Sequence, residues 1–252
     1  MTEFERHQFI VDEARKSKLV NATRLSNTLG VAVQTIRRDL RKLSTTGQLE
    51  RVHGGAALPS GIANIGYDAR RSLNRDLKRR IAGKAVELIP DNASLFLNIG
   101  TTTEAVATAL KNHQNLMIVT NNLNVANILA SHKSCEVVVA GGRLRRADGG
   151  LTGDLAALAI DRFKVDYAII GASAIDPEGD LLDFDPEEVR VSQQIIAAAR
   201  QTIVVGDSGK FSRKAPVRIA SLANVQHFVT DSIPSERFAS WCQDQNTMIH
   251  LA

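Results

Sequence analysis

The 252-residue sequence lacks several features that would define common functional classes. Its two cysteines, Cys135 and Cys242, stand far apart, with no CxxC pair and no histidine at metal-ligand spacing. We therefore expect neither a disulfide framework nor a metal site. The patterns GxGxxG and GxxxxGK[ST] are also absent, which disfavours a dinucleotide or a nucleoside triphosphate, and no cofactor is expected.

Long apolar runs are missing as well. No segment approaches the roughly 20 uninterrupted apolar residues of a membrane span, and the first ten residues have no apolar run behind a basic start. The hydrophobic content of 44% is enough to bury a full core and leave room for a small second domain. We expect a cytoplasmic protein of two domains with no membrane partner.

Two short amphipathic helices are predicted between residues 21 and 43, with a turn at Gly30. Their apolar residues recur at the spacing of one helix face, and these are Leu25 and Leu29 in the first helix and Ile36, Leu40 and Leu43 in the second. Asn21 or Thr23 can cap the first helix, and glycine permits the tight turn. The pattern predicts a helix-turn-helix.

The second helix turns polar and basic side chains away from its apolar face. These residue types read base edges and bind phosphates, and they are Gln34, Thr35, Arg37, Arg38, Arg41 and Lys42. A strand at 48–52, broken by Gly54 and Gly55, fits the hairpin of a winged variant and brings Arg51 and His53 near its tip. The alternative is an ordinary helical hairpin with a solvated basic face.

Positive charge is concentrated in the same part of the chain. Residues 1–58 hold 10 Lys and Arg against 6 Asp and Glu, whereas residues 59–252 hold 21 of each, so the whole formal excess of +4 lies in the first segment. Localised positive charge binds a polyanion by releasing its counterions. We predict that residues 1–58 form a domain that binds double-stranded DNA.

Residues 59–76 are predicted as a linker, because a Pro, Gly, Ser and Asn cluster gives way to charge without apolar periodicity. Amphipathic helices and short apolar runs then alternate over residues 77–252. Strands are predicted at 95–99, 116–120, 136–140, 166–171, 202–206, 226–230 and 248–251. This alternation predicts an α/β domain with a mostly parallel sheet covered on both faces, whose ligands bind beyond the carboxyl ends of the strands.

Those strand ends are rich in glycine and polar residues. The first strand leads through Gly100, Thr101, Thr102 and Thr103 into a helix, so backbone N–H groups, hydroxyls and the positive helix end surround one spot suited to phosphate. A plain glycine turn with a threonine cap is the alternative. Later strands lead into polar or glycine residues at Asn121 and Asn122, Gly141 and Gly142, and Asp207 to Lys210. Their convergence favours a small-anion site.

Carboxylates cluster before and within the start of the helix predicted at 186–200, and they are Asp183, Asp185, Glu187 and Glu188. They either provide negative charge at a helix start or recognise the hydroxyl groups of a phosphorylated polyol. The loop 143–153, which contains Asp148, either closes over the ligand or is a flexible connection.

Six motifs are specific enough to indicate a family, and they are VQTIRRDLRKL and RVHGGA in the first part and NIGTTTEAVA, VTNNLNVAN, VVAGGRLR and VVGDSGKF in the second. With them, nearly the whole chain resembles the DeoR family of bacterial repressors. The resemblance implies a winged DNA-binding domain fused to a non-catalytic sensor domain similar to ribose-5-phosphate isomerase. It also implies a homo-oligomer, a dimer or a tetramer, on operator half-sites.

The resemblance also implies roles for matching positions. The phosphate loop falls on Gly100 to Thr103, ligand contacts fall on Asn121, Asn122, Gly141, Gly142 and Glu188, and a closing pair falls on Asp207 and Lys210. Asn98 stands where many relatives have Asp, which weakens an acid or base role there. Within the family, the resemblance of the segments DGGLTG and LLDFDPEEVR implies glycerol 3-phosphate as the effector.

The expected mechanism links two sites. Free protein binds the operator, and a sugar phosphate favours a state in which paired DNA-binding domains no longer match the half-sites. An isomerase or lyase that uses Glu188, Asp207 and Lys210 as acid and base is one alternative, but it has no need of the basic domain. An architectural DNA-binding protein is another, and it would leave the polar strand ends without a role.

Overall fold

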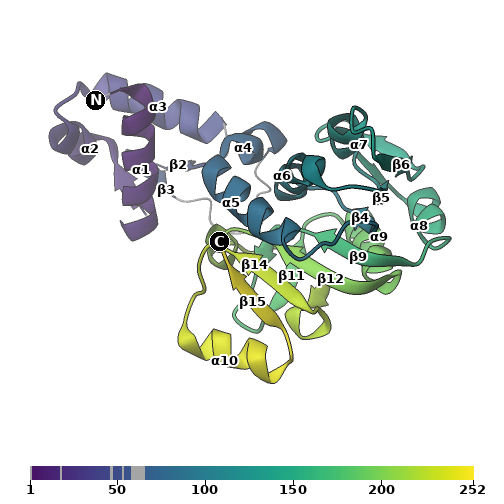
Figure 1. Ribbon diagram of the computed structural model, residues 1–252. Coiled ribbons are helices and arrows are strands. Elements are labelled where there is room, and N and C mark those ends of the chain that lie inside the picture. The colour runs from purple at the N-terminus through teal and green to yellow at the C-terminus, as the bar shows by residue number, and fades with distance from the viewer. Residues whose placement is uncertain (1, 18, 46–47, 53, 58–65) are drawn as a thin grey trace. The chain divides into compact units, whose positions relative to one another are not determined.

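The computed structural model describes residues 2–17, 19–45, 48–52, 54–57 and 66–252. The chain divides into two compact units, Met1–Leu73 and Asn74–Ala252, each of which has its own hydrophobic core (Figure 1). In the segment predicted as a linker, the structure forms helix α4 (Tyr67–Ser72), and α5 already begins at Arg75. Residues 59–65 of that segment lie outside the described part.

The N-terminal unit is a winged helix-turn-helix, as predicted. In chain order its elements are α1 (Glu3–Ser17), β1 (Leu19–Asn21), α2 (Ala22–Leu29), α3 (Val33–Thr45), β2 (Glu50–Val52) and β3 (Gly55–Ala57). The strands form an antiparallel sheet in the order β1-β3-β2, in which β2 and β3 are the wing hairpin. Helix α1 and strand β1 are additional elements, beyond the two helices and the hairpin that the sequence predicts.

Local capping determines where α2 begins and ends. The Asn21 side-chain oxygen accepts hydrogen bonds from the backbone N–H groups of Thr23 at 2.9 Å and Arg24 at 3.2 Å, so Asn21 is the cap. Gly30 ends the helix at φ 63°, a left-handed conformation that costs glycine little. The predicted apolar faces meet in the core, where Leu25, Ile36, Leu40 and Leu43 are buried and Leu29 is half-buried.

A buried ion pair joins α1 to α3. The Asp39 carboxylate is fully buried and accepts hydrogen bonds from Arg6 Nε at 2.5 Å and Arg6 Nη2 at 3.1 Å, while His7 Nε2 lies 3.2 Å from it. Burial alone would raise the pKa of Asp39, but hydrogen bonds from Arg6 and His7 hold it below its usual value. The ionised pair therefore fixes the inner face of α3 against α1.

The C-terminal unit is the predicted α/β domain. Its central sheet has seven parallel strands in the order β15-β14-β12-β9-β4-β5-β6. These strands are β4 (Ser94–Leu97), β5 (Leu116–Thr120), β6 (Cys135–Val139), β9 (Val165–Ile170), β12 (Ala199–Val205), β14 (His227–Thr230) and β15 (Met248–Leu251). Each matches one of the seven predicted strands, which confirms the fold class.

Helices cover both faces of this sheet (Figure 1). One core packs beneath α5 (Arg75–Val86), α6 (Thr101–Ala109) and α7 (Leu123–Leu129), and the other beneath α8 (Asp154–Ile160), α9 (Pro186–Ala197) and α10 (Glu236–Asp244). Helix α9 ends three residues earlier than predicted, because β12 already begins at Ala199. Cys242 is buried and Cys135 half-buried, and both are free thiols.

Short elements that the sequence does not predict connect the main strands and helices. They are the hairpin β7 (Arg143–Arg145) and β8 (Gly150–Thr152), the small sheet of β10 (Ala174–Ile175), β11 (Asp180–Asp183) and β13 (Val217–Ser221), and the 3₁₀ helices η1 (Leu110–Asn112), η2 (Ser208–Ser212) and η3 (Leu222–Asn224). No helix within the described ranges has the length and apolar content to cross a membrane.

The order of strands in the sheet reverses direction between β4 and β9. From β4 the chain adds β5 and β6 on one side, and from β9 it adds β12, β14 and β15 on the other. In parallel α/β sheets such a reversal leaves a crevice at the carboxyl ends of the strands, where ligands bind. The segments that follow β4 and β9 are therefore where a ligand site is expected.

We expect Asp39→Asn to lower the free energy of unfolding of the N-terminal unit by about 2 to 3 kcal/mol, because Arg6 loses its buried counter-ion. The only tryptophan in the sequence, Trp241, lies in the C-terminal unit. In a urea titration, far-UV circular dichroism should show the loss while Trp241 fluorescence stays unchanged. Glu3→Gln, which breaks the exposed Glu3–Lys42 pair, should alter neither signal. Equal effects of the two variants would contradict the role given to Asp39.

Candidate functional site

The outer face of α3 carries most of the residues predicted to contact DNA. Gln34, Arg37, Arg38 and Arg41 are exposed, whereas Thr35 is half-buried. The four exposed side chains line a depression of about 470 Å³ that is completed by Ala22, Leu40, Gly54 and Gly55. The wing hairpin therefore borders the same depression as the recognition helix.

Three further DNA-contact candidates remain, and they are Lys42, Arg51 and His53. Lys42 is exposed, but its Nζ donates to Glu3 Oε1 of α1 at 2.6 Å, and it does not line the depression. Arg51 falls on strand β2, and His53 lies outside the described residues. Among the described residues that line the depression, three are arginines, which suits a helix that reads bases between two phosphate backbones.

The turn after β4 is held together by Thr103. Its Oγ1 lies 2.7 Å from the carbonyl oxygens of both Asn98 and Gly100, so this hydroxyl bonds the turn rather than a ligand. Thr101 is half-buried and Thr102 is buried. Gly100, which precedes α6, has no side chain to cap the helix, and the first N–H groups of a helix have no acceptor within it. These N–H groups are the part of the turn suited to an anion.

Asn98 is also engaged by its neighbours. Its Nδ2 donates to Ser192 Oγ at 2.7 Å, and its Oδ1 accepts from the Ile99 backbone N–H at 2.7 Å. Because both ends of the amide are used inside the protein, Asn98 is suited to holding α9 against the end of β4. The arrangement agrees with the expectation that this position has no acid or base role.

The two asparagines after β5 have different surroundings. Asn122 caps α7, since its Oδ1 accepts from the backbone of Asn124 at 2.9 Å and of Val125 at 3.4 Å. Asn121 Nδ2 donates weakly to the Leu151 carbonyl at 3.3 Å. Its Oδ1 is buried without a hydrogen-bond partner among the described residues. An unsatisfied buried oxygen is costly, so Asn121 is suited to accept a hydrogen bond from a ligand.

Glycine allows the β7–β8 hairpin to approach the end of β6. A Cβ on Gly142, whose φ is 135°, would lie 2.8 Å from the Thr152 carbonyl oxygen and 3.0 Å from Ala156 Cβ. A side chain at Gly142 would therefore displace the hairpin or α8. Gly141 is exposed and meets no such contact.

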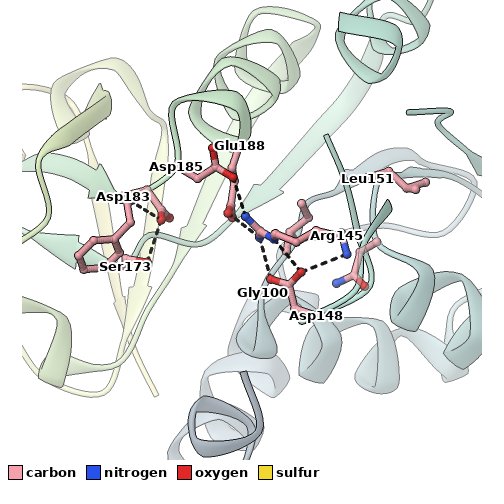
Figure 2. A network of polar contacts seen from close by, with 12 residues as sticks. Gly100, Arg145, Asp148, Leu151, Ser173, Asp183, Asp185 and Glu188 are labelled. Carbon is pink, nitrogen blue, oxygen red and sulfur yellow. Dashed lines mark hydrogen bonds and ion pairs between the residues drawn. The ribbon is translucent and has the colours of Figure 1, made fainter. Parts of the chain in front are cut away.

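Arg145 on β7 is the centre of a polar network that joins this hairpin to α9 (Figure 2). It donates to both carboxylate oxygens of Asp148, from Nε at 2.9 Å and from Nη2 at 2.7 Å. Its Nη1 lies 3.0 Å from Asp185 Oδ2, and its Nη2 lies 2.6 Å from Glu188 Oε2. The turn after β4 reaches the same hairpin, since a Cβ on Gly150 would lie 2.6 Å from Ile99 Cδ1 and 3.2 Å from Asp148 Oδ1.

The surroundings of Glu188 raise the pKa of its carboxyl group. This side chain is buried near the start of α9, and desolvation and the nearby Asp183 raise its pKa to about 7, against the opposing effect of Arg145. Asp183 is itself held by Ser173 Oγ, which donates to it at 3.0 Å, and by the Phe184 backbone N–H at 2.7 Å. Of the predicted carboxylates, Asp185 and Glu188 therefore bond Arg145, Asp183 is held by Ser173, and Glu187 pairs with Arg143.

Asp207 lies at the end of β12 and is buried. Its Oδ1 accepts hydrogen bonds from the Gly209 backbone N–H at 3.1 Å and from Asn74 Nδ2 at 3.0 Å. Burial would raise its pKa, but the positive charge of Lys210 and Arg213 keeps it below the usual value. The predicted pair of Asp207 and Lys210 is thus an electrostatic pair in the structure, and Lys210 is half-buried.

The sequence indicates Arg145 only as one of the arginines that follow Gly141 and Gly142, and it does not indicate Asn74 or Ser173. Arg145 and Asp148 have the i, i+3 spacing of an ion pair, and this was the available signal. The partners that Arg145 has on α9 lie 40 or more residues further along the chain, where no local pattern indicates contact.

A winged helix-turn-helix followed by a parallel α/β unit with buried polar strand ends defines a DNA-binding regulator with a sensor domain. Two domain families match the chain in that order, the DeoR-like helix-turn-helix domain over residues 6–61 and the DeoR C terminal sensor domain over residues 73–232. The chain belongs to the DeoR family of transcriptional repressors.

Similar proteins match it over their full length. The chain is 44% identical over 246 residues to the glycerol-3-phosphate regulon repressor of Haemophilus influenzae, covering 98% of this chain and 96% of the relative. It is 41% identical over 251 residues to the glycerol-3-phosphate regulon repressor of Escherichia coli K12, covering 100% of each. The HTH-type transcriptional repressor CsqR of Escherichia coli is 38% identical over 246 residues, covering 98% of this chain and 94% of the relative.

Solved structures give more distant likenesses. D-ribose-5-phosphate isomerase in complex with phospho-erythronic acid superposes with a TM-score of 0.42 and 18% identity over 54% of each chain. Ribose 5-phosphate isomerase from Methanocaldococcus jannaschii gives a TM-score of 0.41 and 18% identity over 55% of each chain. Likenesses this distant carry no argument about function.

We expect Glu188→Gln to make the stability of the C-terminal unit less dependent on pH. A carboxyl group whose pKa is raised on folding contributes stability that is present below its ordinary pKa and lost as pH rises through the folded value, here about 7. The wild-type melting midpoint, followed by Trp241 fluorescence, should fall between pH 5 and pH 8. The glutamine variant, which mimics the protonated form, should be more stable at pH 8 by on the order of 2 kcal/mol. Glu187→Gln, next to it and exposed, should melt like the wild type, and an identical pH profile for all three proteins would contradict the prediction.

Proposed function

We propose that this protein represses transcription by binding operator DNA through its N-terminal unit, and that glycerol 3-phosphate releases it by binding to the C-terminal unit. The observation that carries the proposal is the combination, in one chain, of an arginine-lined recognition helix and a buried polar site at the strand reversal. The choice of genes and effector follows the relatives at 41% and 44% identity, both named glycerol-3-phosphate regulon repressors.

In the DNA complex, Gln34, Thr35, Arg37 and Arg38 contact base edges in the major groove. Arg41 and Lys42 neutralise phosphates beside them, and Arg51 and His53 do so from the wing. The exposure of three arginines in one depression supports this assignment.

In the effector complex, the phosphate binds at the start of α6, at Gly100 to Thr103, where N–H groups and the helix dipole favour an anion. Asn121, Asp148 and Glu188 accept hydrogen bonds from the hydroxyl groups. The backbone at Gly141 and Gly142 and the side chain of Asn122 shape the site around them, and Asp207 and Lys210 close it. The unsatisfied Asn121 Oδ1 supports a ligand donor at this place.

Release follows from coupling between the two sites. An effector that binds more tightly to a state unable to match the operator half-sites shifts the protein to that state. Two half-sites require at least two copies of the chain, so we propose a homo-oligomer, a dimer or a tetramer, acting on the bacterial chromosome in the cytoplasm. In this role the C-terminal unit binds its ligand without converting it.

One observation favours an enzyme instead. A carboxyl group with a pKa of about 7, such as Glu188, is suited to proton transfer at neutral pH, and a sugar-phosphate isomerase would use it as a base. Against this, Arg145 already engages Glu188 at 2.6 Å. Turnover of ribose 5-phosphate or glycerol 3-phosphate by the full chain would support the enzyme and count against the repressor.

We expect Arg37→Ala and Arg38→Ala to reduce discrimination between the operator and unrelated DNA by about 1 to 3 kcal/mol, because an arginine that reaches a guanine edge contributes that much selectivity. Fluorescence anisotropy with both DNA duplexes measures it. Lys42→Ala is the control and should weaken binding to both duplexes alike, with a smaller salt dependence. Unchanged selectivity in both arginine variants would remove α3 from its proposed role.

We expect Thr101→Glu to keep the protein on its operator in the presence of glycerol 3-phosphate. The added carboxylate repels the phosphate, while an acidic residue in the first turn of a helix favours folding. Thr108→Glu, exposed near the other end of α6, is the matched control and should respond like the wild type. Titration of the operator complex with glycerol 3-phosphate, fructose 1-phosphate and inorganic phosphate identifies the effector. Release by another sugar phosphate alone would contradict glycerol 3-phosphate, and no response to any of them would contradict the sensor.

A further inference from the structure

Arg145 is the residue of the strand-end network to which neither the family match nor the proposed function assigns a role. Its three side-chain nitrogens are all engaged, by Asp148, Asp185 and Glu188 at distances between 2.6 and 3.0 Å. A planar guanidinium fixes the direction of each hydrogen bond it donates, so it also fixes the carboxylates that accept them. Arg145 therefore determines how Asp148 and Glu188 lie.

The charge of this network indicates whether it would bind the phosphate group or the hydroxyl groups of an effector. One guanidinium faces three bonded carboxylates, and Asp183 adds a further carboxylate beside Glu188. This excess of acceptors and negative charge disfavours a phosphate and favours groups that donate hydrogen bonds, such as hydroxyls. A phosphate would have to compete with three carboxylates for Arg145, whereas the start of α6 offers N–H groups without that competition.

The two carboxylates that Arg145 aligns are buried and lie on different elements. Asp148 belongs to the turn of the β7–β8 hairpin and is also bonded to the Gly150 backbone N–H at 3.2 Å, and Glu188 belongs to the first turn of α9. Arg145 bonds Oε2 of Glu188, which leaves Oε1 as an acceptor. Asn121, whose oxygen is unsatisfied, is linked to the same hairpin through Leu151. The hairpin thus bonds three residues that carry oxygen acceptors, Asp148 and Glu188 through Arg145 and Asn121 through Leu151.

We propose that Arg145 is the positioning residue for the polyol end of the effector, because it aligns Asp148 and Glu188 to accept hydrogen bonds from the effector's hydroxyl groups while the phosphate binds at the start of α6. The inference rests on the proposed function and adds to it the residue that separates a phosphorylated polyol from a bare phosphate. Arg145 acts through the two carboxylates and does not itself bind the phosphate.

The test measures two ligands on the full-length protein by isothermal titration calorimetry, glycerol 3-phosphate and inorganic phosphate. Arg145→Gln should bind glycerol 3-phosphate about tenfold more weakly and inorganic phosphate within about twofold of the wild type. Arg145→Lys, which keeps the charge without the planar fork, should recover part of the lost affinity. Arg143→Gln is the matched control, since it breaks the exposed ion pair of the same hairpin with Glu187 and should leave both affinities unchanged.

Failure of this inference and failure of the proposed function would give different results. Equal losses for both ligands in Arg145→Gln, or no loss for either, would overturn the inference while the wild type still binds glycerol 3-phosphate. If Arg145→Gln does not fold, Asp185→Asn provides the same comparison, because asparagine keeps the α9 cap and removes one charged partner of Arg145. Asp185→Asn should then weaken glycerol 3-phosphate binding selectively, and an equal change for both ligands would count against Arg145. Wild-type protein that binds neither ligand would overturn the proposed function itself.

Discussion

Burial of polar groups at the carboxyl edge of the parallel sheet is the constraint on which the C-terminal unit depends. A polar side chain removed from water needs a partner inside the protein, and the strand ends supply partners to one another. Thr103 and Asn98 bond the turn after β4, Asn122 caps α7, and Arg145 serves three carboxylates at once. A change to one of these residues leaves another without its partner. The edge is therefore a preorganised surface, and Asn121 Oδ1 is its one buried side-chain oxygen without a partner in the described part of the chain.

Periodicity predicted the regular elements well, because burial on one helix face or inside a covered sheet leaves a repeated apolar pattern. It predicted the helix-turn-helix and all seven central strands. Elements of two or three residues, such as β10 and β7, are too short to show a period. Asp39 illustrates a second limit. It stands on the core side of α3 within a basic segment, and its partner Arg6 is 33 residues away, so only the folded chain shows that the two belong together.

The sequence predicted where the candidate site residues lie better than it predicted what each side chain does. Glycines and polar residues at strand ends indicated where to look, and the structure brings Asp148 and Glu188 together on Arg145 (Figure 2). It also separates residues that the sequence treats alike. Asn121 and Asn122 are neighbours with the same side chain, yet one caps a helix and the other has an oxygen left over. That difference depends on the direction of each side chain, which the sequence does not encode locally.

Asn74, the first residue of the C-terminal unit, ties its own backbone conformation to the end of β12. Its backbone is left-handed at φ 54°, a conformation that carries a modest cost for a residue with a side chain, and its amide donates to Asp207 at the end of β12. The residue before it, Leu73, is the last of the N-terminal unit. A ligand that draws Asp207 away would remove the bond that offsets this cost and let the backbone at Asn74 rotate. The backbone torsion of the first residue of the C-terminal unit is thus coupled to the side chain at the end of β12.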